Sequence, residues 1–134
     1  MDRPEIGGIS PFFIVKDVAA AFAFYCGKLG FEVVFQSEPD DLFFGIVKRG
    51  PAMIFLKDIG VEPVPNYTRD IKKGIARWDA YVYVPDPDAL AGEFASRGVE
   101  FFVPLPLEET DDGLRGFEIK DADGYVLFFG GPRS

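Results

Sequence analysis

The chain alternates between short runs with a two-residue hydrophobic period and two longer stretches with a helical period. The run ISPFFIVKD at 9–17 alternates as a half-buried strand does. The apolar positions that share one helical face after it are Val18, Phe22, Tyr25 and Leu29. Asp17 suits the N-cap of this helix, and Gly30 suits the residue after its last turn. The pattern therefore predicts a strand followed by a helix.

The same pattern occurs a second time along the chain. The run WDAYVYVPD at 78–86 corresponds to 9–17, and PDALAGEFASRG follows it as a second predicted helix. Its cap, Asp86, lies 69 positions after the first cap, and its stop, Gly98, lies 68 positions after Gly30. A repeat that matches at both ends of a helix indicates two copies of one structural unit.

Each copy continues with three more predicted strands. They cover 31–37, 42–48 and 52–57 in the first copy, and 100–103, 114–120 and 125–129 in the second. Each copy is thus a β-α-β-β-β module, and the fold class is α+β. Module one covers 9–57, a linker with prolines and glycines covers 58–76, and module two covers 77–130. We expect one domain over 1–134, in which the modules pair into a curved eight-stranded mixed sheet with a concave ligand cleft.

Three stretches of the chain carry a family resemblance. They are AAAFAFYCGKLGFEV, DPDALAGEFASRGVEF and LRGFEIKDADGYVLFFG, the last with Ala122 and Tyr125 where the family pattern has Pro and Asn. The chain thereby resembles the glyoxalase, bleomycin-resistance and extradiol-dioxygenase superfamily, also called vicinal oxygen chelate, over nearly its whole length. The resemblance implies the paired-module fold but specifies function poorly, because one fold hosts many chemistries.

Metal-dependent members of this superfamily place His, Gln or Glu ligands on the first and last strands of each module. The resemblance assigns these positions to Ser10, Phe55, Asp79 and Phe128, with Trp78 as an alternative register for Asp79. Zinc and iron sites need imidazole or thiolate ligands, and the chain has no histidine. The four side chains also offer too few oxygens for Mg²⁺. We therefore predict that the protein uses no metal and no cofactor.

Strand alternation predicts which side chains face the cleft. The walls are expected to be Phe12, Phe55, Tyr81, Tyr83 and Phe128, with Ser10 and Asp79 on the same side and Phe44 and Trp78 as flanking rings. Aromatic walls hold flat molecules by stacking and attract cations through the ring face. For each ring, a place in the ordinary core remains the alternative. Arg115 either reaches the cleft mouth or pairs with a nearby carboxylate, and for Glu118 a structural or surface role is favoured.

Charge and composition exclude several classes of partner. The net charge is −8 and the basic residues are scattered, so a nucleic-acid surface is not expected. No apolar run approaches the roughly 20 residues that span a bilayer, so a membrane partner is not expected either. The single cysteine, Cys26, cannot form an intrachain disulfide, which favours a reducing, cytoplasmic location.

These observations lead to one functional hypothesis and one alternative. The hypothesis is a small-molecule binding protein of the bleomycin-resistance type, which sequesters a flat aromatic and possibly cationic ligand as a homodimer, without catalytic residues. An antibiotic-resistance role would follow from this resemblance. The alternative is a metal-independent or degenerate lyase or isomerase that uses Asp79, Glu118 or a tyrosine.

Overall fold

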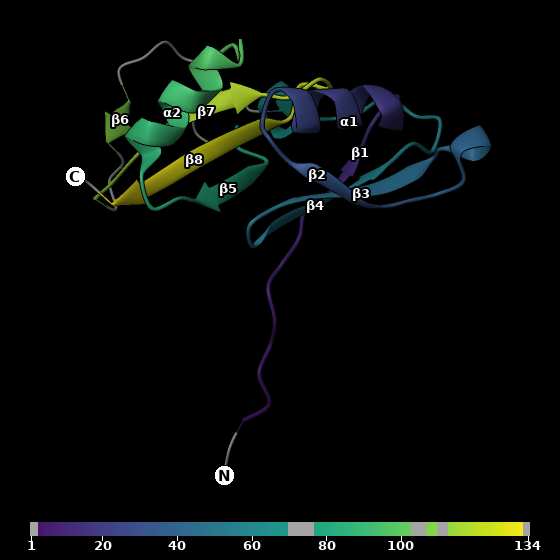
Figure 1. Cartoon of the computed structure of the whole chain (residues 1–134), viewed down its shortest axis with the longest axis horizontal. Helices are drawn as coiled ribbons and strands as arrows, with labels where there is room; N and C mark the ends of the chain where they lie inside the picture. The colour runs from purple at the N-terminus through teal and green to yellow at the C-terminus, as the bar shows by residue number, and fades with distance from the viewer. Residues whose placement is uncertain (1–2, 70–76, 103–106, 110–112, 133–134) are drawn as a thin grey trace.

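The computed structural model describes residues 3–69, 77–102, 107–109 and 113–132 of the chain. Module one contains β1 (Phe12–Ile14), α1 (Val18–Gly27), β2 (Glu32–Gln36), β3 (Phe44–Arg49) and β4 (Ala52–Lys57). Module two contains β5 (Ala80–Tyr83), α2 (Pro87–Ser96), β6 (Glu108–Glu109), β7 (Leu114–Lys120) and β8 (Val126–Pro132). Two short 3-10 helices, η1 (Pro39–Asp41) and η2 (Asn66–Arg69), lie in connecting segments. Both α-helices cover the same side of the molecule (Figure 1).

Each module folds into its own four-stranded sheet. The strand orders β1-β4-β3-β2 and β5-β8-β7-β6 are equivalent, and each sheet has one parallel pair, β1 with β4 and β5 with β8. The register repeats as well, because Phe12 pairs with Phe55 as Tyr81 pairs with Phe128. The α+β class with two sheets and two helices is confirmed. A single eight-stranded sheet is not, because among the described residues no strand of one sheet pairs with a strand of the other.

Module two departs from the expected strand pattern after α2. The expected strand at 100–103 is reduced to one bridge between Phe101 and Ile119, and residue 103 lies outside the described residues. The outer strand of the sheet is instead β6, which pairs with β7. Two adjacent acidic residues have no hydrophobic period, so only their pairing with β7 makes them a strand. The residues Asp111, Asp112 and Gly113 predict a turn before β7, and the first two of them lie outside the described residues.

Both α-helices begin directly after the predicted caps and end at Gly27 and Ser96, shortly before the predicted stop glycines. The side chain of Asp17 accepts a hydrogen bond from Ala20 N at 3.2 Å, and that of Asp86 accepts one from Ala89 N at 3.1 Å. These bonds satisfy amide groups that have no partner within the helix. Gly30 and Gly98 follow the helix ends with φ of +71° and +79°, a backbone region that side chains disfavour.

The core lies between the helices and the helix-facing sides of the two sheets. Its largest members include Tyr25, Leu29, Leu56, Phe94, Phe117 and Phe129. Phe13 is buried as expected and stacks on Tyr125 of module two at 4.2 Å, so the core continues across the junction. Further bonds cross there, with donors in module one and acceptors in module two. Arg49 pairs with Glu93 of α2 at 2.8 Å, and Tyr25 of α1 donates to Asp121 at 2.6 Å.

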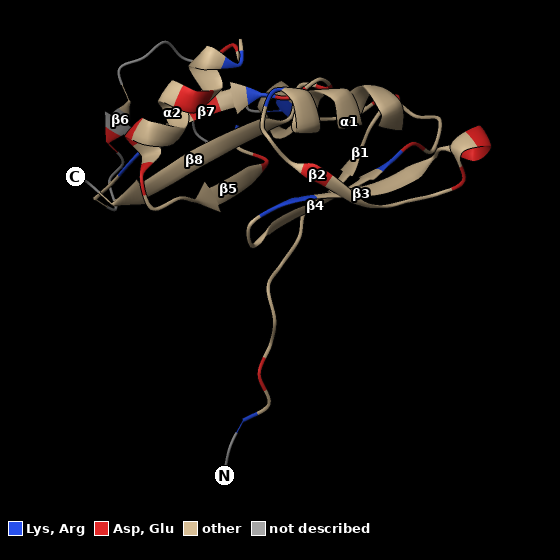
Figure 2. Ribbon diagram, viewed as in Figure 1, with Lys and Arg blue, Asp and Glu red and all other residues tan. Residues whose placement is uncertain are grey.

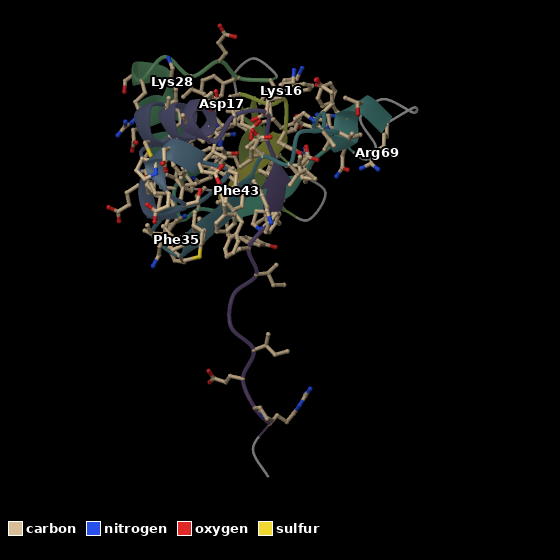
Figure 3. All side chains as sticks on the ribbon, turned by 90° about the vertical axis from the view of Figure 1, so that its right-hand side faces the viewer. Lys16, Asp17, Lys28, Phe35, Phe43 and Arg69 are labelled. Atoms are coloured by element: carbon tan, nitrogen blue, oxygen red, sulfur yellow. The ribbon has the colours of Figure 1, made fainter. Side chains whose placement is uncertain are left out.

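The sheet faces that point away from the helices are called the open faces below. Figure 3 shows Phe35 at the side of the body opposite to Lys28 and Asp17, which lie near the helices. Acidic residues are spread over both modules, and some of them lie in η1 and α2 (Figure 2). The segment that precedes β1 runs away from the body as an extended tail (Figure 1).

Candidate functional site

Four rings of module two are in contact on its open face and form the second ring cluster: Trp78, Tyr81, Tyr83 and Phe128. The ring of Phe128 lies 4.2 Å from that of Trp78, at an interplanar angle of 27°, and 5.1 Å from that of Tyr81. Tyr81 in turn lies 4.8 Å from Tyr83. Phe128 has no exposed surface, whereas Trp78 is 36% and Tyr83 78% exposed. The surface that a ligand meets here is therefore Trp78 and Tyr83, with Phe128 as the support behind them.

A buried carboxylate lies next to Phe128 in this face. Glu118 is the register partner of Phe128 on β7, and its side chain is fully buried. Trp78 Nε1 donates to Glu118 Oε1 at 2.9 Å. The Arg77 guanidinium binds the same carboxylate in bidentate fashion, with Nε donating to Oε2 at 2.8 Å and Nη2 to Oε1. A buried carboxylate is stable only when it is paired in this way.

Sequence reasoning missed Arg77 as a functional candidate and left a surface role open for Glu118. A surface position for Glu118 is wrong, and its role is an ion pair beneath the ring cluster. The alternation of side chains along β7 could have placed Glu118 on the open face. Gly116, Glu118 and Lys120 alternate there with the helix-facing Phe117 and Ile119. Lys120 lies on this face too, with its ammonium over the rings of Tyr67 and Phe102 at 4.3 and 4.7 Å.

Module one carries the first ring cluster on its open face: Phe12, Phe35, Phe44 and Phe55. Phe12 lies 5.8 Å from Phe55 and 6.2 Å from Phe44. Phe44 also contacts Phe35 at 5.9 Å. Phe12 and Phe35 are 55% and 54% exposed, which is unusual for phenyl rings in a folded domain. The rings that were expected to line one cleft thus form one group on each sheet.

An apolar groove of about 680 Å³ opens at the junction of the two modules. Tyr81, Tyr83 and Met53 are among its lining residues, together with the Gly50–Pro51 turn and the segment from Val84 to Asp86. Phe12, Phe55 and Phe128 lie outside it. Its size suits a small organic molecule.

The family's metal-ligand positions do not fit a metal ion in this fold. Both carboxylate oxygens of Asp79 accept backbone hydrogen bonds, from Asn66 N at 2.9 Å and Val126 N at 2.8 Å. Phe128 is sealed beneath Trp78, and Ser10 lies in the exposed tail ahead of β1. Within the part of the chain that the structure describes, no three His, Cys, Asp or Glu side chains are grouped as metal ligands. Asp79 instead ties η2 and β8 to the start of β5.

Arg115 pairs with a carboxylate, the second of its two expected roles. Its guanidinium binds Asp88 of α2, with Nη2 3.0 Å from Oδ1, and lowers the pKa of that carboxyl. Because side chains alternate along β7, Arg115 projects to the helix side of the sheet. The expected position at the cleft mouth is therefore wrong.

A family model of the glyoxalase/bleomycin resistance protein/dioxygenase superfamily matches residues 8–129. The chain belongs to this superfamily. The two paired modules with their open sheet faces agree with that membership. Comparison with curated protein sequences finds no significant match.

Solved structures with the same superfamily fold include binding proteins and enzymes. A bleomycin-binding protein from bleomycin-producing Streptomyces verticillus, solved with copper(II)-bleomycin, is 26% identical, with a TM-score of 0.70 over 98% of this chain and 100% of that chain. A glyoxalase-related enzyme from Clostridium phytofermentans is 16% identical, with a TM-score of 0.74 over 97% and 98%. A lactoylglutathione lyase from Agrobacterium tumefaciens is 20% identical, with a TM-score of 0.67 over 96% of each chain. The last two likenesses show the fold alone.

No helix among the described residues is long and apolar enough to cross a membrane.

Proposed function

We propose that the protein binds and sequesters a flat aromatic small molecule without converting it. The observation that carries this proposal is the contiguous second ring cluster, in which Trp78 and Tyr83 are exposed. Ring faces offer area and orientation to a planar ligand, and Tyr81 and Tyr83 of this cluster also line the apolar groove. The likeness to the bleomycin-binding protein supports a small-molecule ligand.

We propose further that a second copy of the chain completes the site. Both open faces expose rings that a soluble monomer would normally cover, most clearly Phe12, Phe35 and Tyr83. A two-fold pair can place the first ring cluster of one chain opposite the second ring cluster of the other. A planar ligand would then be held between rings from two chains.

Metal-independent binding is part of the proposal. Its support is the set of side chains at the family's ligand positions, above all the carboxylate of Asp79, whose two oxygens are engaged by backbone amides. Two of the groups that the lyase or isomerase alternative would use are engaged, Asp79 by backbone amides and Glu118 by Arg77 and Trp78.

The test is a thermal-shift screen of flat aromatic compounds, half of them cationic and half neutral, followed by calorimetry on the hits. We expect stoichiometric binding, and mass spectrometry of the released compound should recover it unchanged. A compound that is bound and converted would favour the enzyme alternative. A screen without any stabilising planar compound would refute the proposal.

A further inference from the structure

The floor of the second ring cluster combines two groups that rarely lie side by side in a buried place. Phe128 provides an aromatic face, and Glu118, its register partner on β7, provides a carboxylate. Both side chains are fully buried. A ring face beside a carboxylate is the arrangement that recognises a planar cation, which can stack on the ring and donate paired hydrogen bonds to the acid.

Two consecutive residues of the chain now fill these two roles. Trp78 stacks on Phe128 and donates its indole N–H to Glu118 at 2.9 Å. Arg77 places its guanidinium on the same carboxylate through two bonds. Together they present to the floor what a ligand with an aromatic ring and an amidinium group would present.

We propose that Arg77 and Trp78 are an internal surrogate in a site for planar cations, and that such a cation displaces them from Glu118 and Phe128. The class of ligand is an amidinium or guanidinium on an aromatic ring, or a protonated amino-heteroaromatic ring. This inference rests on the proposed function and names the chemistry of its ligand, which would stack on Phe128 in place of Trp78 instead of on the exposed face of Trp78.

The ligand must carry a positive charge because it replaces the Arg77 guanidinium on Glu118. Removal of Arg77 by a neutral molecule would leave the buried carboxylate of Glu118 unpaired, which is strongly unfavourable. A cationic ligand restores the ion pair, so the exchange costs little and stacking can drive it. The net charge of −8 also attracts cations to the protein.

The burial pattern agrees with a removable cover. The Arg77 side chain is 22% exposed and Trp78 36%, whereas the Glu118 side chain beneath them is 1% exposed. The two residues adjoin in the chain, directly ahead of β5, and Asn66 Nδ2 holds the Trp78 carbonyl at 2.9 Å, so the exchange requires only their side chains to leave the floor. Arg77 also lies 5.8 Å from the centre of the Phe102 ring, which offers the guanidinium a second contact.

The intrinsic fluorescence of the protein tests the exchange directly, because Trp78 is the sole tryptophan of the chain. The probes are benzamidine and its neutral isostere benzamide. We expect benzamidine to bind, to red-shift the emission and to make Trp78 more accessible to quenching by acrylamide. Benzamide should bind on the order of a hundredfold more weakly or not detectably, because it would leave the buried carboxylate of Glu118 unpaired.

Three variants separate a surrogate from a structural ion pair. Glu118→Gln should weaken benzamidine binding on the order of tenfold or more, since the charge partner is lost. Arg77→Ala should tighten it on the order of tenfold, because the internal competitor is gone. Arg115→Ala is the matched control, since it breaks an Arg–carboxylate pair on the helix side and should leave benzamidine binding unchanged. Equal or weaker binding by Arg77→Ala would overturn the inference.

If the Arg77→Ala variant folds poorly, a second measurement still tests the proposal. Methylguanidinium at concentrations far below denaturing ones should raise its Tm by refilling the Glu118 site, while urea should not. The Arg77→Ala/Glu118→Gln double variant should show no such rise, and a rise there would count against the site.

The results also distinguish this inference from the proposed function. If neutral flat compounds bind while benzamidine neither binds nor exposes Trp78, the inference fails and sequestration stands. If no planar compound binds at all, the proposed function fails with it.

Discussion

Lys28 and Arg97 each hold the end of the helix that the other one caps. Lys28 closes α1, and its Nζ donates to Arg97 O and Gly98 O at 3.3 Å each. Arg97 closes α2, and its Nη1 donates to Gly27 O at 3.2 Å. The two residues lie 69 positions apart, the spacing of the repeat. Cations near helix C-termini are favourable, so this reciprocal contact stabilises the junction of the modules.

Asp121, at the same junction, should make stability depend on pH. Burial raises its pKa from 3.8 to about 6, although Tyr25 and two backbone amides donate to it. The folded protein therefore holds a proton in a range where the unfolded chain has released it. The contribution of Asp121 to the free energy of unfolding is complete below about pH 4 and is lost as the pH rises through about 6.

We expect Asp121→Asn to remove this fall of stability with rising pH, which amounts to at most about 3 kcal/mol. Urea unfolding at several pH values between 4 and 7.5, followed by Trp78 fluorescence, measures it. Asp88→Asn is the control: Arg115 lowers the pKa of that exposed acid, so it titrates below this pH range and the variant should keep the wild-type fall in stability. Parallel pH profiles for wild type and Asp121→Asn would disprove the assignment.

Gly45 of β3 is expected to tolerate no side chain. A Cβ there would lie 2.1 Å from Cζ of Phe22 on α1, so Gly45→Ala should destabilise the protein by about 1–3 kcal/mol. Gly92→Ala is the matched control, since nothing lies within 4 Å of its Cβ in the middle of α2. It should stabilise by about 1 kcal/mol through helix propensity. Denaturant unfolding of both variants checks the opposite signs.

Phe128 should matter more for ligand binding than an equally buried ring of the core. Phe128→Ala removes the support of Trp78 and should weaken binding by about 1–3 kcal/mol, besides about 3–5 kcal/mol of stability. Phe13→Ala, on the helix side, should cost similar stability but less affinity. Calorimetry and denaturation on both variants make the comparison. Equal losses of affinity would assign Phe128 to the ordinary core.

A homodimer should give a mass near 30 kDa by light scattering, twice the 14.9 kDa of one chain. Phe35→Glu should dissociate it, because a charge would then be buried among the rings of the open face. Ile59→Glu is the control at a similarly exposed apolar position outside both ring clusters. Dissociation by both variants, or a wild-type monomer at micromolar concentration, would contradict the shared site.

Metal binding is a further point of decision. After dialysis against Ni²⁺, Zn²⁺, Mn²⁺ or Fe²⁺ and desalting, we expect elemental analysis to find no stoichiometric ion, since the phenyl rings of Phe55 and Phe128 cannot ligate one. One retained ion per chain would refute metal independence.

The sequence by itself determined the modules, because their signals are local. A cap such as Asp17, a stop such as Gly30 and a two-residue period each act within a few positions, and the repeat of these signals reports the second copy. Strand parity likewise assigned Phe12 and Tyr81 to the open faces before any contact was known.

Only the tertiary structure decided how the modules meet and which groups complete the candidate site. The bonds between Glu118 and Arg77 span 41 positions, and no local pattern reports such a pairing. β6 exists only because β7 offers it hydrogen bonds, and Asp79 is engaged only because β8 and η2 bring their amides to it. The physical reason is that burial and pairing between distant segments are set by the packing of the whole chain, which a local hydrophobic period does not encode.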